Sequence, residues 1–274
     1  MRKRRKGGSR DPEGRMPLME HLRELRRRVF WSVLALVPGV TLGWIFYDRL
    51  IAWLSAPICD VHVSSNVGGG SCGPLIINGL LGPFNLQVKV ALVAGVFLAS
   101  PVWLYHLWAF VTPGLHRNER RWTIGFLVTG IPLFFAGAAI CYWILPRATT
   151  LLLGFTPDQV GSIVDFNEFL SIVMRLMLVF GLAFEVPVFI VLLNLAGILP
   201  ARKLAGWWRQ IVFGVFLFAA VATPTGDPFT MTALAAPLCL LILLAYVFCR
   251  VHDARRGRPD IDYDELADDQ VSPL

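Results

Sequence analysis

Five acidic side chains are the residues of this sequence best suited to chemistry. They are Glu20, Glu24, Glu119, Glu185 and Asp227. Charged residues make up only 16% of the 274, so each carboxylate in or beside an apolar stretch requires an explanation. Glu20 and Glu24 lie four residues apart in MPLMEHLRELRRRV, so a helix places them on one face. Arg28 follows Glu24 at the same spacing, so a local ion pair is an alternative to a functional role.

Glu185 is the carboxylate that lies inside an apolar stretch, FGLAFEVPVF. It lies about 16 residues past the start of its span, which is ~24 Å of helical rise. A carboxylate at that depth is costly, so its default interpretation is functional. Arg175 lies ~15 Å away along the same helix and cannot pair with it directly. We therefore expect Glu185 to be protonated, hydrated, or facing a cavity or a partner.

Glu119 and Asp227 lie in short loops, where structural and functional roles both stay open. Glu119 lies among the arginines of PGLHRNERR, so a solvated salt bridge is the alternative to a binding role. Asp227 lies in ATPTGDPFT, directly before an apolar run, where its carboxylate can cap the following helix. Capping and a functional role are compatible at that position.

Enzyme and metal-site motifs are missing from the sequence. It contains no His-Glu-x-x-His, no Gly-x-Ser-x-Gly and no phosphate-binding glycine loop. None of its five histidines has a second ligand at metal spacing. We therefore expect no catalytic residue, no metal and no cofactor. The net charge is +6, but the lysines and arginines cluster in particular loops and do not form one basic face. This distribution argues against nucleic acid as a partner.

A membrane-embedded bundle must position these residues, because 55% of the chain is hydrophobic and its apolar runs approach the ~20 residues of a bilayer span. In lipid, an α-helix pairs the N–H and C=O groups of its own backbone, so each span is expected to be helical. The sequence predicts an all-α membrane protein with six transmembrane helices, the fifth and sixth short. The predicted spans are residues 29–47, 86–111, 122–145, 169–195, 207–222 and 229–248. Kinks or local unwinding are expected at Pro38, Pro101, Pro132, Pro187 and Pro237.

Lysine and arginine orient these spans. Twenty-one of the 25 fall in the N-terminal segment, the second and fourth loops and the C-terminal tail, whereas the other loops hold Arg49 and Arg147. The positive-inside rule then places both termini in the cytoplasm, with the chain in the cytoplasmic (inner) membrane. We expect a basic cytoplasmic segment 1–28, a transmembrane domain 29–248 and a disordered acidic cytoplasmic tail 249–274. Segment 1–28 is too charged for a cleavable signal peptide, so the first span should remain as an anchor.

The first outer loop, residues 49–87, is the longest connection and contains Cys59 and Cys72. Because this loop faces an oxidising compartment, we predict a disulfide between them; two free thiols are the alternative. The remaining cysteines lie in or beside spans, where we expect them to pack as small apolar residues. They are Cys141, Cys239 and Cys249.

Five stretches, taken together, resemble a known family. They are MPLMEHLRELRRRV, LSAP after the first span, FLASPVWLYHLWAFVTPGLHRNERR, FGLAFEVPVFIVLLNLAGIL and TPTGDPFTM. In their order, their spacing and the predicted topology they resemble the TatC family over roughly residues 16–250. One stretch alone is weak evidence, but five in order are not expected by chance.

The resemblance implies a receptor for signal peptides with two adjacent arginines. Such a receptor works with single-span partners of the TatA and TatB type and with other copies of itself, and exports folded proteins by the proton-motive force. By motif, Glu24 and Glu119 match family glutamates implicated in holding the arginines, and we group Glu20, Arg26 and Phe110 with them. Family positions otherwise tied to activity are Pro57, Pro101, Glu185 and Asp227.

The chemistry fits this resemblance, because two carboxylates facing an Arg-Arg pair form bidentate hydrogen bonds that lysine does not match. Two positions depart from the family. His106 stands where glutamine is usual, and Met231 stands where a polar residue is usual, which weakens the polar patch expected on the fifth and sixth spans. The basic residues 2–6 are expected to attract anionic membrane lipid.

Two other functions are alternatives to the receptor. The first is a proton-coupled secondary transporter or channel with Glu185 as its ion site. The absence of internal repeats and the single buried carboxylate argue against it. The second is a membrane enzyme, and the missing motifs argue against that.

Overall fold

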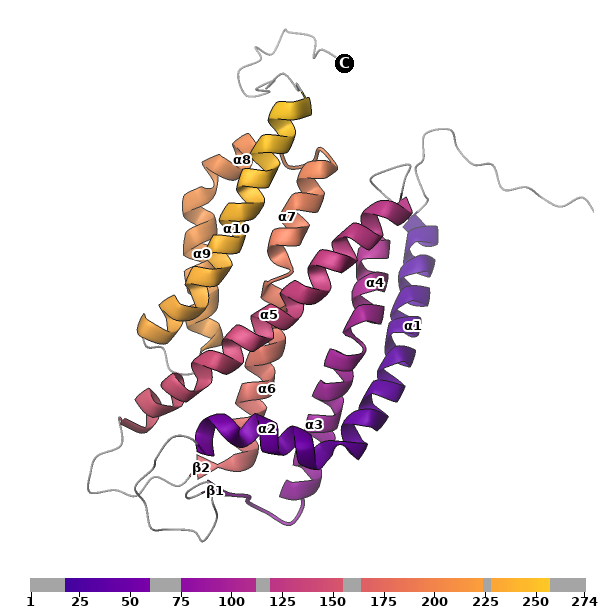
Figure 1. The fold of residues 1–274 in the computed structure, drawn as a ribbon. Helices are drawn as coiled ribbons and strands as arrows, with labels where there is room; N and C mark the ends of the chain where they lie inside the picture. The colour runs from indigo at the N-terminus through magenta and orange to yellow at the C-terminus, as the bar shows by residue number, and fades with distance from the viewer. Residues whose placement is uncertain (1–17, 60–74, 112–118, 155–163, 224–227, 257–274) are drawn as a thin grey trace, which may run out of the picture. The chain divides into compact units, whose positions relative to one another are not determined.

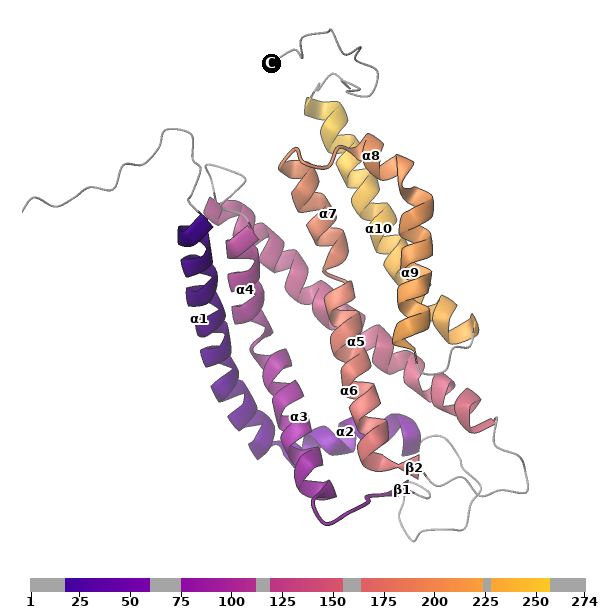
Figure 2. The same ribbon diagram turned by 180° about the vertical axis from the view of Figure 1, so that it is seen from behind.

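The computed structural model describes residues 18–59, 75–111, 119–154, 164–223 and 228–256, which are almost entirely helical (Figures 1 and 2). The elements in chain order are α1 (Leu18–Ile45), α2 (Tyr47–Cys59), β1 (Leu75–Ile76), α3 (Gly82–Leu98), α4 (Ser100–Val111), α5 (Glu119–Gly154), β2 (Val164–Asp165), α6 (Phe166–Ala183), α7 (Val186–Leu195), α8 (Ala201–Gly206), α9 (Trp208–Ala222) and α10 (Pro228–Arg256).

Each apolar stretch that the sequence predicts as a span contains helix. By length and composition, α1, α5, the α6–α7 pair and α10 can each cross a membrane, and the bent α3–α4 pair is a fifth candidate. The 15-residue α9 rises only ~22 Å, as expected for a short fifth helix. The expectation of a short sixth helix is wrong. Helix α10 has 29 residues and rises ~43 Å, because it continues past the apolar stretch into a charged segment that ends at Arg256.

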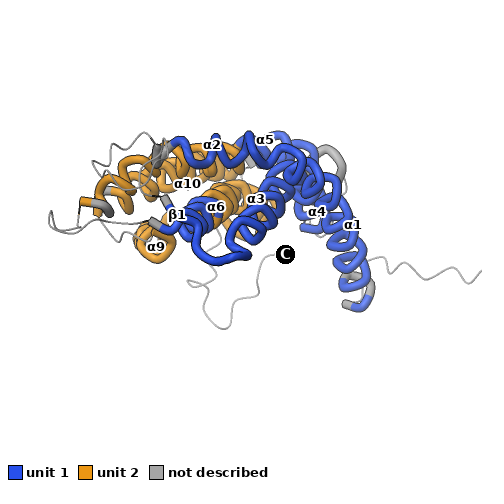
Figure 3. The backbone as a smooth tube through the Cα atoms, turned by 90° about the horizontal axis from the view of Figure 1, so that it is seen from below, with its two compact units in different colours: residues 1–56, 75–132, 164–174 blue, residues 57–74, 133–163, 175–274 orange. Residues whose placement is uncertain are grey.

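The chain forms two compact units, shown in different colours in Figure 3. Unit 1 contains residues 1–56, 75–132 and 164–174, and unit 2 contains residues 57–74, 133–163 and 175–274. Among the described elements, unit 1 therefore holds α1, α3, α4, the strands and most of α2. Unit 2 holds α7, α8, α9 and α10, and the long helices α5 and α6 contribute to both units.

In unit 1, α1 and α3 approach closely along glycines. A Cβ on Gly39 would lie 2.8 Å from the carbonyl oxygen of Gly95, and one on Gly43 would lie 2.9 Å from that of Ala91. Conversely, a Cβ on Gly95 would lie 2.5 Å from Val40 Cγ2 and 2.9 Å from its backbone nitrogen. Small residues at such a contact let two apolar helices pack by van der Waals attraction where lipid offers no hydrophobic drive.

Helices α3 and α4 form one span with a bend of 55°. Pro101 lies in the first turn of α4, and its ring nitrogen cannot donate the hydrogen bond that would continue α3. The indole Nε1 of Trp103 reaches back across the bend and donates to the carbonyl oxygen of Val96, in the last turn of α3, at 3.0 Å. The kink predicted at Pro101 is confirmed, whereas α1 and α10 continue through Pro38 and Pro237.

A polar cluster joins the two strands of unit 1 to α3 and α6. Asp165 Oδ1 accepts hydrogen bonds from the backbone N–H groups of Asn167 (2.8 Å) and Glu168 (3.3 Å) and so caps α6. Asp165 Oδ2 accepts a hydrogen bond from Asn78 Nδ2 at 2.9 Å. Lys89 on α3 donates to Asn167 Oδ1 at 3.0 Å. The hydrogen bond from Asn78, followed by those from the backbone, lowers the pKa of the Asp165 carboxyl.

In unit 2, a buried amide joins the ends of α7, α8 and α10. Asn194 is 1% exposed, and its Nδ2 donates to both carboxylate oxygens of Asp253 at 3.0 Å and to the carbonyl oxygen of Leu199 at 3.0 Å. Asp253 Oδ2 also accepts from the N–H of Ala201 at 2.8 Å and so caps α8. Gly197 ends α7 with a φ of +78° and donates to the carbonyl oxygen of Asn194 at 2.8 Å.

Candidate functional site

Glu24 lies in the second turn of α1 and is paired with Arg28 one turn later. Its Oε1 accepts hydrogen bonds from Arg28 Nε at 3.0 Å and from Arg28 Nη2 at 2.5 Å. The local ion pair that the sequence left open is therefore formed. The two side chains stay partly exposed, 29% for Glu24 and 22% for Arg28. Because Glu24 Oε2 has no hydrogen-bond partner among the described residues, it is available to a ligand.

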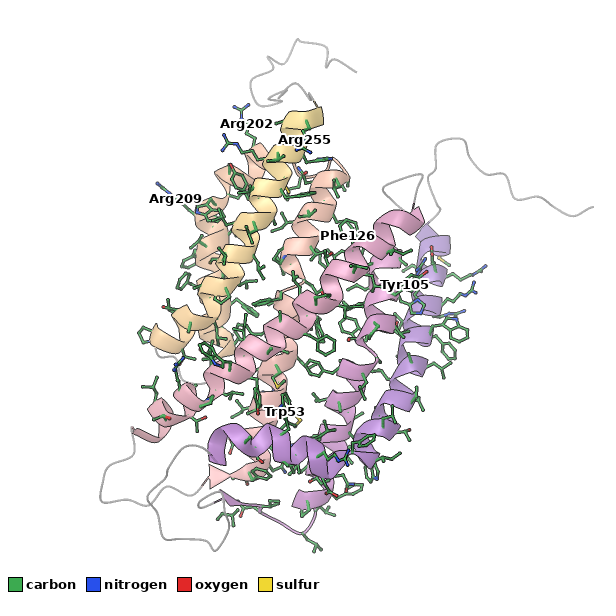
Figure 4. The ribbon with its side chains drawn as sticks, viewed as in Figure 1. Trp53, Tyr105, Phe126, Arg202, Arg209 and Arg255 are labelled. Atoms are coloured by element: carbon green, nitrogen blue, oxygen red, sulfur yellow. The ribbon has the colours of Figure 1, made fainter. Side chains whose placement is uncertain are left out.

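Aromatic side chains of α4 and α5 lie in the same unit, and α1 packs against α4. Trp108 stacks on Phe126 of α5 with ring centroids 5.4 Å apart. The rings of Tyr105 and His106 meet edge to face at 5.5 Å. Figure 4 shows Tyr105 and Phe126 toward the end of unit 1 where α1 begins. Glu24 and Arg28 therefore belong to the same end of the unit as this aromatic group.

The five residues predicted to bind a ligand at this end are described to different extents. Arg26 is exposed on α1, and Phe110 is half-buried near the end of α4. The backbones of Glu20 and Glu119 belong to α1 and α5, but their side chains lie outside the described residues. The structure thus brings Glu24 into one unit with Phe110, and the meeting of the carboxylates stays a prediction.

Glu185 lies at the break between α6 and α7, two residues before Pro187. Glu185 is 2% exposed and therefore buried. The interruption predicted at Pro187 is confirmed, whereas Arg175 is exposed on α6. Four further predicted residues have no described side chain. They are Pro57 and Cys59, whose backbones belong to α2, and Cys72 and Asp227.

The described part of the chain brings no three His, Cys, Asp or Glu side chains together in a way that could hold a metal ion. The arrangement of Glu24, Arg28 and the aromatic side chains offers binding by charge and hydrogen bonds, without a nucleophile paired to a base.

The model of one protein family, described as Sec-independent protein translocase protein (TatC), matches residues 20–237. The chain belongs to the TatC family. The TatC protein of Frankia casuarinae is 44% identical, over 96% of this chain and 74% of the relative. That of Xylanimonas cellulosilytica is 43% identical, over 89% of this chain and 87% of the relative. A solved structure described as the twin arginine translocase receptor TatC in DDM has a TM-score of 0.71 and 31% identity, and the match covers 83% of this chain and 98% of that one.

Membership of the TatC family confirms the resemblance carried by the five sequence stretches. It makes the chain a multi-pass membrane protein and a component of a Tat protein translocase, which implies a complex with other subunits. The TatC relatives are named for translocation and not for catalysis.

Sequence reasoning missed the amide–carboxylate contact between Asn194 and Asp253. A signal was present, because Asn194 interrupts the apolar run VLLNLAG and Asp253 interrupts the basic run CRVHDARR. A buried amide needs hydrogen-bond partners, so an Asn in such a run predicts a polar contact elsewhere in the chain. The pattern does not say which residue makes that contact.

Proposed function

We propose that this chain is the core receptor subunit of a twin-arginine translocation system. It binds the twin-arginine signal peptides of folded proteins and, with TatA- and TatB-type single-span partners, exports them by the proton-motive force. The observation that carries the proposal is the partly exposed Glu24 carboxylate, which keeps Oε2 available beside the pair with Arg28. Similarity to a solved twin arginine translocase receptor supports it.

Recognition of two adjacent arginines requires more than one acceptor. Glu24 supplies one carboxylate on α1, and Glu119, the first residue of α5, supplies the second, with Glu20 one turn before Glu24. A guanidinium forms two parallel N–H···O bonds to a carboxylate, whereas an ammonium group acts as a point charge. Phe110 adds an apolar contact at the end of α4, and Arg26 is grouped with the site as an exposed polar side chain of α1.

The proposal includes a membrane topology. All six apolar segments, the short α9 included, cross the inner membrane, with segment 1–28 and tail 249–274 in the cytoplasm and residues 29–248 as the transmembrane domain. The distribution of lysine and arginine supports it, because 21 of 25 fall in the four segments that this topology places on one side. The Glu24 end of α1 is then on the side from which signal peptides arrive.

Intramembrane coupling to partner subunits is assigned to Glu185, Asp227, Pro57 and Pro101. The burial of Glu185 at a helix break supports this, because a carboxylate is retained in lipid chiefly where it meets a polar partner or water. An intramembrane hydrogen bond contributes ~0.6–2 kcal/mol, enough to select a docking mode but too little to hold a complex alone.

Crosslinking of a twin-arginine signal peptide to membrane vesicles that contain the full chain tests the receptor assignment. Glu24→Ala and Glu119→Ala are compared with wild type, and Arg-Arg signals are compared with Lys-Lys signals. Loss of a charged hydrogen-bonding partner costs ~1.5–3 kcal/mol, so each variant should need about ten- to a hundredfold more peptide for equal crosslinking. Glu168→Ala is the matched control, because Glu168 is exposed at the start of α6.

Crosslinks that persist unchanged in both variants and with Lys-Lys signals would contradict the assignment of the carboxylates. Wild-type vesicles that give no crosslink at all would contradict the receptor function itself. The transporter alternative finds no support in the relatives, which carry a translocase name. Substrate uptake by vesicles without partner subunits would revive it.

A further inference from the structure

The described basic residues of unit 2 gather at one end, apart from Arg147 and Arg175, which lie within α5 and α6. Helix α8 packs against both α9 and α10 and so joins these residues into one surface. Figure 4 shows Arg202 and Arg255 at this end and Arg209 on the same side of the unit. The basic surface consists of Arg202 and Lys203 in α8, Arg209 in the first turn of α9, and Arg250 and Arg255 in the last turns of α10.

Among the described residues, acidic side chains do not balance this basic surface. Asp253 is the one carboxylate described at this end, and its oxygens already accept the hydrogen bonds that cap α8 and hold the buried amide. In the described part of the chain, Lys203, Arg209, Arg250 and Arg255 have no ion-pair partner. The surface therefore presents a concentrated positive charge to whatever lies against it.

Exposed aromatic side chains border the basic surface. Trp207 is 56% exposed next to the start of α9, and Phe248 is 50% exposed on α10. The rings of Trp208 and Tyr246 lie 6.4 Å apart, which places the start of α9 beside α10 one turn before Arg250. Basic side chains next to exposed aromatic ones are typical of the depth at which a helix passes lipid headgroups.

Helix lengths place the same residues at a headgroup layer. Helix α9 rises ~22 Å, less than the ~30 Å hydrocarbon core, so a bilayer must thin beside it and its headgroups approach Arg209. Helix α10 rises ~43 Å, so its last turns, with Arg250 and Arg255, extend beyond the hydrocarbon core.

We propose that the basic surface binds the phosphate groups of anionic phospholipids at the membrane face where α8, α9 and α10 meet. The positive-inside rule makes this the cytoplasmic leaflet. A competing occupant is the chain's own segment 260–269, which follows α10 closely and carries six carboxylates. The lipid is favoured because the surface continues into exposed apolar side chains such as Phe248, which acyl chains cover and a carboxylate-rich segment does not.

Titration of the full chain, purified in a neutral detergent, with phosphatidylglycerol or with phosphatidylcholine tests this site, with retained lipid counted by native mass spectrometry. Wild type should retain phosphatidylglycerol in preference, and added salt should weaken that preference. Arg209→Gln with Arg255→Gln should weaken phosphatidylglycerol binding about thirtyfold, which corresponds to ~1 kcal/mol for each of two basic groups near an anionic surface. Arg49→Gln with Arg147→Gln removes the same charge elsewhere and should leave binding within twofold of wild type.

A pair that keeps the charge, Arg209→Lys with Arg255→Lys, should retain the preference. Equal losses in the Arg209/Arg255 and Arg49/Arg147 glutamine pairs, or no loss in either, would overturn the site, since the effect would then follow total charge or be absent. Deletion of residues 257–274 addresses the competing occupant. Phosphatidylglycerol binding that appears only after this deletion would show that the acidic segment fills the surface in the full chain, and would also overturn the proposal.

Discussion

Replacing Asp253 with alanine should destabilise unit 2 by removing three hydrogen bonds at once. The cap of α8, made to the N–H of Ala201, contributes ~1 kcal/mol. The charge-assisted contact with Asn194 contributes ~1.5–3 kcal/mol, and its loss leaves the buried amide with the carbonyl oxygen of Leu199 as its described acceptor. The free energy of unfolding should therefore fall by about 2–4 kcal/mol.

Thermal unfolding of the purified full chain, followed by tryptophan fluorescence, measures this loss. At roughly 2–4 °C for each kcal/mol in larger domains, the Tm of Asp253→Ala should fall by about 4–16 °C. Asp253→Asn keeps one acceptor oxygen, so its Tm should lie between the Tm of Asp253→Ala and that of wild type. Asp48→Ala removes an exposed acid from the start of α2 and should shift the free energy of unfolding by no more than ~0.5 kcal/mol.

A double variant separates the contact with Asn194 from the cap. Because Asn194→Leu removes the buried amide itself, the Asp253→Ala change should cost less in that background than in wild type. Additive losses would show that the two side chains do not stabilise each other. A Tm of Asp253→Ala within about 1 °C of wild type would refute the reasoning as a whole.

Three further changes test the packing of unit 1. Gly95→Leu should separate α1 from α3 and lower the Tm by several degrees, because even its Cβ meets backbone atoms, whereas Gly214→Ala, which has open space around it, should leave the Tm unchanged or higher. Trp103→Phe should cost ~1 kcal/mol of unfolding free energy, measured by the same melting assay, by removing the indole donor at the bend. Folding lowers the pKa of Asp165, so its stabilisation is present above the ordinary carboxyl pKa and is lost as the pH falls through the folded value. Melting curves between about pH 6 and pH 3 should show this loss in wild type and not in Asp165→Asn.

Hydropathy predicted the helices well because a bilayer imposes both their length and their hydrogen bonding. It predicted the end of α10 too early, because Arg250 and the charged residues after it end the apolar stretch but not the helix. Arginine and alanine are good helix formers, so the helix continues into water beyond the apolar stretch. A polarity pattern locates the edge of the membrane and not the end of the helix.

Contacts between distant segments lay beyond sequence reasoning. Leu75 pairs with Val164, and Asn194 meets Asp253, each across more than 50 residues. Periodicity reports which face of an element is apolar, but it carries no information on which other element covers that face. The pair of Glu24 and Arg28 could be predicted, because its geometry follows from helical spacing alone.

The pair of Glu24 and Arg28 bears on how an arginine ligand would be recognised in the proposed receptor. If an incoming guanidinium displaced Arg28, it would exchange one charged pair for an equivalent one, and the loss of the Arg28 pair would offset part of the affinity gained. If it bound Oε2 beside Arg28, two guanidinium groups would share one carboxylate, and their repulsion would offset part of the gain. In either case the pair with Arg28 reduces what one arginine gains from Glu24, and a second carboxylate that binds a second arginine adds to the net affinity. In the proposed receptor, a preference for two adjacent arginines would then follow from a carboxylate that already pairs with Arg28.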